Sequence, residues 1–202
     1  VHYLERYGDD PGEQLCTDDF AGHLAHNVNL SAKAIVGIAC YARILERCGE
    51  KSQAEEWEKR ARSMAESWLK RAQMPSGSRL SFGQEGWSIK YNLAWDLALR
   101  LQLLPRSFYA RETEGYLHHL KKYGFPLDSR AEYTKSDWEI WAASMAQDRE
   151  TFCRLVAPLA KYLRETESRL PFSDWYDTET GRYVHFIARS VQGGVFMPFL
   201  TC

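Results

Sequence analysis

The sequence lacks the features that mark several common protein classes. No run approaches the ~18 consecutive apolar residues of a membrane span, and no signal peptide is recognisable. Lysine and arginine form no basic stripe, acidic residues form no block, and the formal net charge is -1. We therefore expect neither a nucleic acid nor a membrane as a partner.

Familiar catalytic signatures are missing as well. Gly-x-Ser-x-Gly, a P-loop, GxGxxG and HExxH do not occur. His23 and His26 could share a metal ion, but no third ligand stands out, so we expect no metal and no other cofactor. The cysteines show no CxxC pair and no zinc-ligand spacing, which predicts mostly free thiols at Cys16, Cys40, Cys48, Cys153 and Cys202.

The composition that remains is that of an ordinary globular protein. Of the 202 residues, 45% are hydrophobic and 26% are charged. A chain of this length can bury a sizeable core, and we expect residues 1–202 to form one domain. Aromatic residues make up 13% of the chain, including seven Trp. Most should pack in the core, although such rings also line carbohydrate and amino-acid pockets.

Hydrophobic periodicity predicts helices in pairs. Residues 27–48 are apolar on nearly every face, which predicts a helix buried on all sides and stopped by Gly49. Residues 52–73 carry a single apolar stripe at steps of three and four, so that helix should keep one face in water. A short insert, either irregular or hairpin-like, is expected at 80–87.

The same alternation recurs twice, at a period of roughly 45 residues. The further expected pairs are 91–103 with 107–123 and 138–145 with 149–164. The fold class that we predict is all-α: three αα-hairpins in two layers, part of an (α/α)6 toroid, with a short strand-like tail at 183–188. In such a layout the inner helices run parallel, and their N-termini meet at one end.

Clusters of polar residues precede each inner helix and follow the last hairpin. Ser-Asp-Trp occurs twice, at 136–138 and 173–175. In a hydrolase with paired carboxylates, burial keeps one acid protonated while the other activates water. Four residues of these clusters could instead be simple N-caps: Asp18, Ser136, Asp137 and Ser173. On this basis the acid/base candidates are Asp18, Asp19, Asp137 and Asp174.

Substrate-binding candidates come from the same clusters. Lys135 could act electrostatically or simply pair with Asp137, and Arg189 could bind a ligand carboxylate or tie the tail to Asp174 or Asp177. The other proposed binding residues are aromatic or amide side chains at Trp138, Trp175, Tyr91 and Asn92.

Six segments resemble the C-terminal region of glutaminase A-type proteins: residues 14–35, 87–93, 126–130, 134–138, 173–178 and 188–194. The resemblance implies a six-hairpin toroid, hydrolysis of glutamine, and secretion from a fungus or bacterium. Full-length members are several times longer, and this chain offers about three of six hairpins. We therefore expect the C-terminal part of a longer protein, whose partner is the missing part of the toroid or a second copy.

Three functional hypotheses follow. The first is an amidohydrolase acting on L-glutamine or a related small amide. The second is a carbohydrate-active toroid, because Trp beside carboxylates also suits sugar stacking and glycosidic acid catalysis. The third is a half-ring without activity of its own, which associates through exposed apolar helices.

Overall fold

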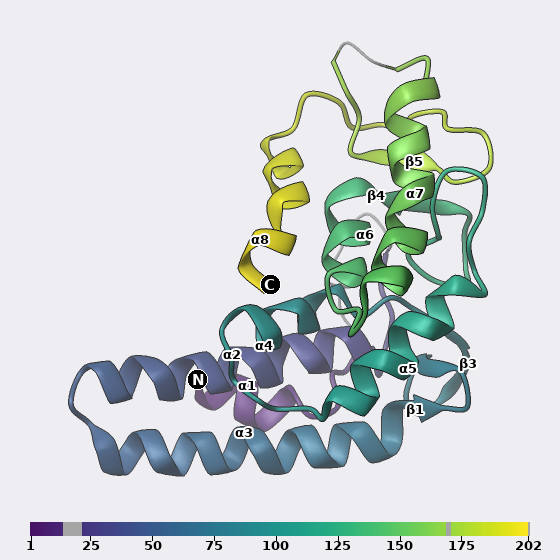
Figure 1. The fold of residues 1–202 in the computed structure, drawn as a ribbon. Coiled ribbons are helices and arrows are strands. Elements are labelled where there is room, and N and C mark those ends of the chain that lie inside the picture. Colours follow the sequence, from purple (N-terminus) through teal and green to yellow (C-terminus); the bar gives the residue numbers. More distant parts are fainter. Residues whose placement is uncertain (14–21, 169–170, 202) are drawn as a thin grey trace.

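The computed structural model describes residues 1–13, 22–168 and 171–201, and its regular structure is mainly helical (Figure 1). The helices are α1 (His2–Tyr7), α2 (Val28–Arg47), α3 (Lys51–Ala72), η2 (Tyr91–Leu93), α4 (Ala94–Ala98), α5 (Arg106–Leu117), α6 (Ser136–Ala143), α7 (Arg149–Glu165), η3 (Ser190–Phe196) and α8 (Pro198–Thr201). The strands are short: β1 (Gln73–Met74), β2 (Gly77–Ser81), β3 (Gln84–Trp87), β4 (Tyr133–Lys135) and β5 (Trp175–Asp177).

The first predicted hairpin is present as α2 and α3. Asn27 caps α2 by accepting the backbone N–H of Leu30 at 2.9 Å, and Gly49, with φ of +87°, turns the chain after it. Trp68 of α3 donates its indole N–H to the carbonyl of Val28 at 2.9 Å. As predicted, α3 buries a single stripe.

The prediction that α2 is buried on all sides is wrong for its second half. Arg43 is exposed and Ile44 is 57% exposed, because the outer end of the α2–α3 hairpin extends past the rest of the chain (Figure 1). Contrary to the expectation from apolar runs, α2 is long and apolar enough to span a membrane by length and composition. Of its most apolar window, 56% is buried inside the protein, as in a core helix.

The second predicted inner helix is much shorter than 91–103. It consists of η2 followed by α4, which ends at Ala98 because the buried Asp96 carboxylate accepts the backbone N–H groups of Leu103 and Leu104. These bonds fold the chain back, with Arg100 and Gln102 at positive φ. The following helix, α5, ends at Leu117 instead of near 123.

Short strands make the remaining connections. The predicted insert at 80–87 is an antiparallel hairpin of β2 and β3. A second ribbon pairs β4 with β5 and sets Lys135 opposite Trp175. The strand-like tail predicted at 183–188 is wrong: within that stretch an isolated bridge links Tyr183 to Tyr176, and the chain then enters η3 and α8.

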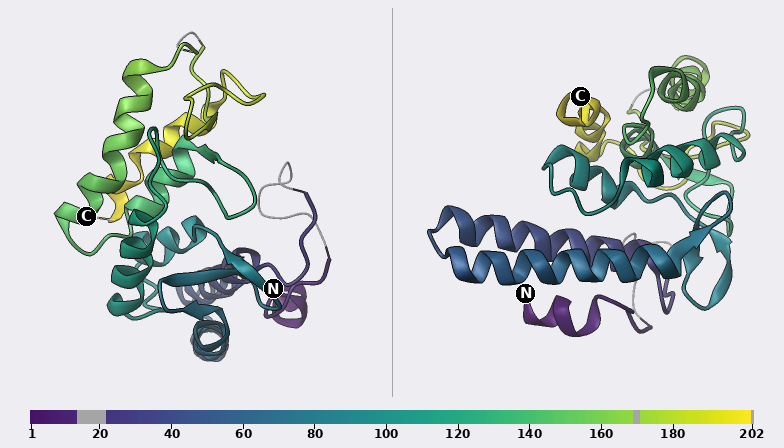
Figure 2. Two further views of the ribbon diagram at one scale, coloured as in Figure 1. Left: turned by 90° about the vertical axis from the view of Figure 1, so that its right-hand side faces the viewer. Right: turned by 60° about the horizontal axis from the view of Figure 1, so that its bottom comes forward.

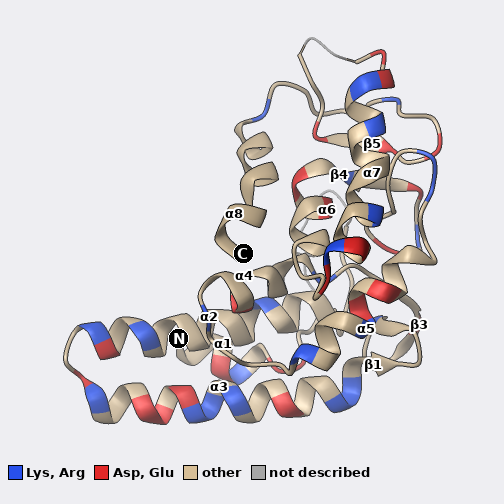
Figure 3. Ribbon diagram, in the orientation of Figure 1, with Lys and Arg blue, Asp and Glu red and all other residues tan. Residues whose placement is uncertain are grey.

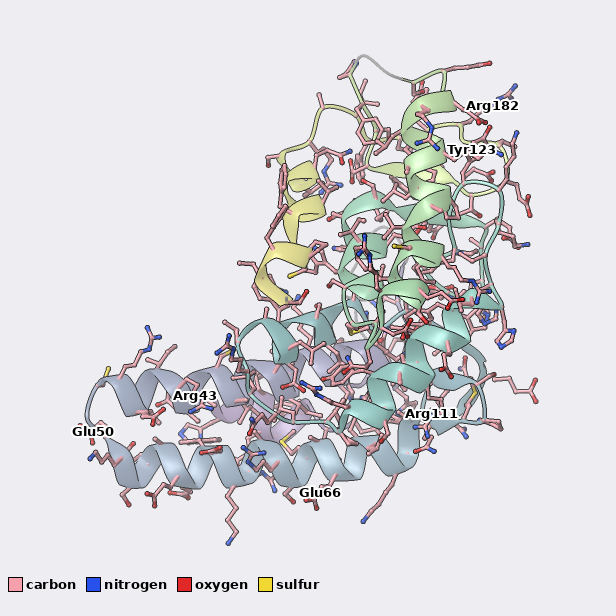
Figure 4. The ribbon with its side chains drawn as sticks, viewed as in Figure 1. Arg43, Glu50, Glu66, Arg111, Tyr123 and Arg182 are labelled. Atoms are coloured by element: carbon pink, nitrogen blue, oxygen red, sulfur yellow. The ribbon has the colours of Figure 1, made fainter. Side chains whose placement is uncertain are left out.

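The hairpins do not stand side by side. In Figures 1 and 2, α6 and α7 run across the direction of α2 and α3, with η3 and α8 beside α6. Figure 4 shows Arg43, Glu50 and Glu66 on the α2–α3 hairpin, far from Tyr123 beside α7. The helical-hairpin class is confirmed, whereas the two-layer toroid stays a prediction.

Candidate functional site

The β4–β5 ribbon brings the two Ser-Asp-Trp segments together. The backbone N–H of Ser136, the first residue of α6, donates to the carbonyl of Asp174 at 2.8 Å. The strands are antiparallel, and Lys135 at the end of β4 pairs with Trp175 at the start of β5. The residues that follow β4 therefore lie beside the residues that precede β5. Two segments that are distant in sequence therefore form one polar group at the start of α6.

A buried ion pair lies at the centre of this group. The Lys135 ammonium contacts Oδ2 of Asp174, and these two side chains are 1% and 0% exposed. Arg189 reaches the same oxygen from the tail, with Nη1 at 3.5 Å. The carboxylate partner found for Lys135 is thus Asp174 instead of Asp137, and Arg189 ties the tail to Asp174. Two cations beside one carboxylate offset its desolvation.

Asp137 follows Ser136 on α6 and has surroundings that differ from those of the ion pair. Burial raises the pKa of Asp137 to about 6, and the nearby Asp174 adds to the rise while Lys135 opposes it. Oδ1 of Asp137 and Oδ1 of Asp174 are buried and have no hydrogen-bond partner in the part of the chain that is described. The helix begins after Lys135 without a side-chain cap bond, so Asp137 does not act as an N-cap.

Aromatic rings surround the charged residues. Tyr91 and Trp138 stack with their centroids 4.3 Å apart and their planes within 3°. The Lys135 ammonium lies 5.1 Å from the Trp138 ring, and the Arg189 guanidinium lies 4.5 Å from the Phe186 ring. Trp175 meets that same Phe186 ring at 5.3 Å. The structure therefore groups Tyr91, Trp138 and Trp175 around the ion pair.

Three other predicted site residues are not placed in this group. Asp18 and Asp19 lie outside the described residues. Asn92 lines a separate apolar groove between α1 and α2, together with Leu4 and Trp95.

The described histidines and cysteines have contacts or free thiols of their own. His26 makes a hydrogen bond of 2.8 Å with Asp10. Across 1–13, 22–168 and 171–201, no three or more His, Cys, Asp or Glu side chains are grouped so that they could hold a metal ion. Cys40, Cys48 and Cys153 are free thiols, as expected.

Comparison with known proteins identifies the family. The model of the glutaminase A six helical-hairpin domain matches residues 1–199. The chain belongs to this family. It is 38% identical to glutaminase A of Aspergillus oryzae over 196 residues, which cover 92% of this chain and 28% of that protein. It is 30% identical to a probable glutaminase of Arthroderma benhamiae, covering 96% of this chain and 26% of that protein. The chain thus spans about a quarter of the length of these relatives.

In this glutaminase A domain, η3 supplies residues that the sequence analysis did not select. Ser136 donates its hydroxyl proton to Oε1 of Gln192 at 2.9 Å, and the Trp141 indole donates to the carbonyl of Gly194 at 2.9 Å. Ser136 belongs to the repeated Ser-Asp-Trp, and Gln192 lies in the family-like segment 188–194. Both signals were available, but nothing in the sequence indicated that the two residues meet.

A second buried polar group lies around Lys90, which directly precedes Tyr91. Lys90 donates to the carbonyl of Ser88 at 2.6 Å and to its hydroxyl at 2.8 Å. Burial lowers the pKa of Lys90 to about 8, against the opposing charges of Glu112 and Asp128. Lys90 is 0% exposed, so this group fixes the loop that carries Tyr91.

Proposed function

We propose that this glutaminase A domain takes part in hydrolysis of the side-chain amide of L-glutamine, giving glutamate and ammonia. The observation that carries the proposal is the pair of neighbouring buried carboxyl groups at the start of α6: Asp174 contacts Lys135 and Arg189, whereas burial raises the pKa of Asp137 to about 6. The names of the relatives support the substrate, since both are glutaminases by name.

The two carboxyl groups suit opposite proton transfers. Lys135 and Arg189 contact Oδ2 of Asp174, and Oδ1, which has no partner among the described residues, is the proposed acceptor of a proton from water as the water oxygen bonds to the amide carbon. Asp137, neutral below about pH 6, donates its proton to the nitrogen as the carbon–nitrogen bond breaks. Ammonia leaves, and Asp174 then returns its proton through solvent to Asp137.

Binding of the rest of the substrate falls to the charged and aromatic neighbours. Arg189 is 36% exposed, so its guanidinium can bind a substrate carboxylate while it stays near Asp174. The Tyr91–Trp138 stack supplies a flat apolar surface for the methylene groups.

Replacement of Asp137 by Asn tests the assignment. Asp137→Asn keeps the size of the side chain and removes the acid, so ammonia release from L-glutamine should fall about 10²- to 10⁴-fold. Asp148→Asn is the matched control, because Asp148 caps α7 in solvent and Asn caps equally well. Release should be unchanged in that variant.

Two results would contradict the proposal at different levels. Full ammonia release by each single Asn variant of Asp18, Asp19, Asp137 and Asp174 would refute the site. No release by the full-length protein would refute the function, and turnover of glycosides in its place would favour the carbohydrate-active alternative.

A further inference from the structure

The side chain of Gln192 reaches into the candidate site from the tail. Its Oε1 accepts the hydroxyl proton of Ser136 at 2.9 Å, and Ser136 is 1% exposed. The side chain of glutamine is a primary carboxamide, which is the group that the proposed reaction cleaves. The chain therefore places its own carboxamide on Ser136, the residue that directly precedes Asp137.

Contacts on both sides of Gln192 hold the backbone of η3 in place. Arg189 contacts Asp174 before it, and the carbonyl of Gly194 accepts the Trp141 indole N–H after it. Gly194 packs so closely that a Cβ there would lie 2.8 Å from Cβ of Asp137. These contacts hold Gln192 over the start of α6.

The polar atoms beside this carboxamide are not satisfied. Nε2 of Gln192, Oδ1 of Asp137 and Oδ1 of Asp174 are all buried, without hydrogen-bond partners among the described residues. A buried polar atom without a hydrogen-bond partner destabilises the folded chain. The group thus has one unused donor, on Gln192, and two unused acceptors, on Asp137 and Asp174. The two aspartates are at least 97% buried. A ligand that carries both a donor and an acceptor would satisfy these atoms better than Gln192 does.

We propose that Ser136 binds the carbonyl oxygen of a substrate carboxamide, and that the substrate displaces the carboxamide of Gln192 from this position. The substrate class rests on the proposed function, whereas the competition rests on the contacts of Ser136 and Gln192. A bound amide would take the Ser136 hydroxyl as donor, with its nitrogen facing the free carboxyl oxygens. The side chain of Gln192 then acts as a cover that moves aside when substrate enters, while Arg189 stays beside Asp174.

Equilibrium binding of L-glutamine to the full chain tests the proposal. Gln192→Met keeps the length of the side chain and removes the competing amide, so affinity should rise about three- to tenfold, as expected for one net hydrogen bond. Ser136→Ala should lower it by a similar factor. Gln147→Met is the control, because Gln147 is exposed in the loop after α6 and should leave affinity unchanged.

Control ligands and backgrounds make the outcomes distinct. L-Norleucine lacks the amide, so its affinity should not rise in Gln192→Met. Titration in the Asp137→Asn background prevents turnover. Unchanged or weaker L-glutamine binding by a folded Gln192→Met or Gln192→Ala variant, or no binding by any variant, would overturn the proposal. Tighter binding without any ammonia release by the full-length protein would keep the competition and refute the proposed function alone.

Discussion

Asp137 and Glu139 lie two residues apart on α6, yet their surroundings give them different roles. Burial raises the pKa of Glu139 to about 8, so both acids hold protons more tightly than usual. Both Glu139 oxygens have partners: the N–H of Phe125 at 3.1 Å and the hydroxyl of Tyr176 at 2.6 Å. Asp137 keeps one buried oxygen without a partner. Glu139 thus ties α6 to β5, while Asp137 is the residue that we propose as the acid.

Glu139 should make stability depend on pH. Its folded pKa lies above the unfolded value, so its stabilising contribution is full below about pH 4.5 and is lost as pH rises towards 8. Glu139→Gln keeps the shape, and its melting temperature should therefore fall less between pH 5 and pH 8 than that of the unchanged chain. Glu114→Gln, exposed on α5, is the control. Parallel pH profiles for Glu139→Gln and the unchanged chain would contradict this.

Asp137 should set the pH dependence of activity. As the proposed acid it must be protonated, so kcat for ammonia release should decline as pH rises through about 6, the pKa to which burial raises this group. The decline should vanish in the residual activity of Asp137→Asn. Activity that instead rises through pH 6 would assign Asp137 as a base and reverse the two proposed roles.

At the scale of elements, the packing of η3 on α6 depends on one of two neighbouring glycines. A Cβ on Gly194 would lie 2.8 Å from Asp137 and 3.0 Å from the Trp141 indole nitrogen, whereas a Cβ on Gly193 would meet nothing within 4 Å. Gly194→Ala should therefore displace η3, lower stability by about 1–3 kcal/mol and change ammonia release. Gly193→Ala should do neither.

Chemical denaturation and ammonia assays measure both glycine variants. Equal effects of Gly193→Ala and Gly194→Ala would show that η3 is not held against α6 in solution. The pair is informative because the two substitutions are chemically identical and adjacent.

Sequence patterns predicted the elements with local causes. The stripe of α3 and the stop at Gly49 follow from nearby residues, and both are present. The helix predicted at 91–103 is shorter in the structure because Asp96 accepts backbone N–H groups seven and eight residues further on. Hydrophobic periodicity does not predict such a hydrogen bond. In the site, Asp137 and Asp174 were chosen by residue type, but the pairing of Lys135 with Asp174 could not be predicted without the β4–β5 register. Gln192 was missed for the same reason.

On the scale of the whole molecule, charge is unevenly distributed. Figure 3 shows mixed charges along α3 and none on α8. Residues 190–201 carry no Lys, Arg, Asp or Glu, yet Phe196, Phe199 and Leu200 are exposed, Phe199 by 81%. An apolar surface of this kind suits a second copy of the chain or a further part of a longer protein.

The isolated chain should therefore self-associate. Light scattering should give a mass above 23.4 kDa that rises with concentration. Phe199→Ser should shift this rise to higher concentration, whereas Leu163→Ser, an exposed apolar residue on α7, should not. A mass of 23.4 kDa at every concentration would contradict self-association and leave the longer protein as the expected partner.

The contacts of the candidate site also order its appearance during synthesis. The α2–α3 hairpin joins residues that are close in sequence and can form as soon as they emerge. The site needs Ser136 to meet Gln192, 56 residues later, and Trp141 to meet Gly194, 53 residues later. Closing such loops is slower. A nascent chain would therefore complete its first hairpin early. The candidate site would form only after Gly194 has left the ribosome.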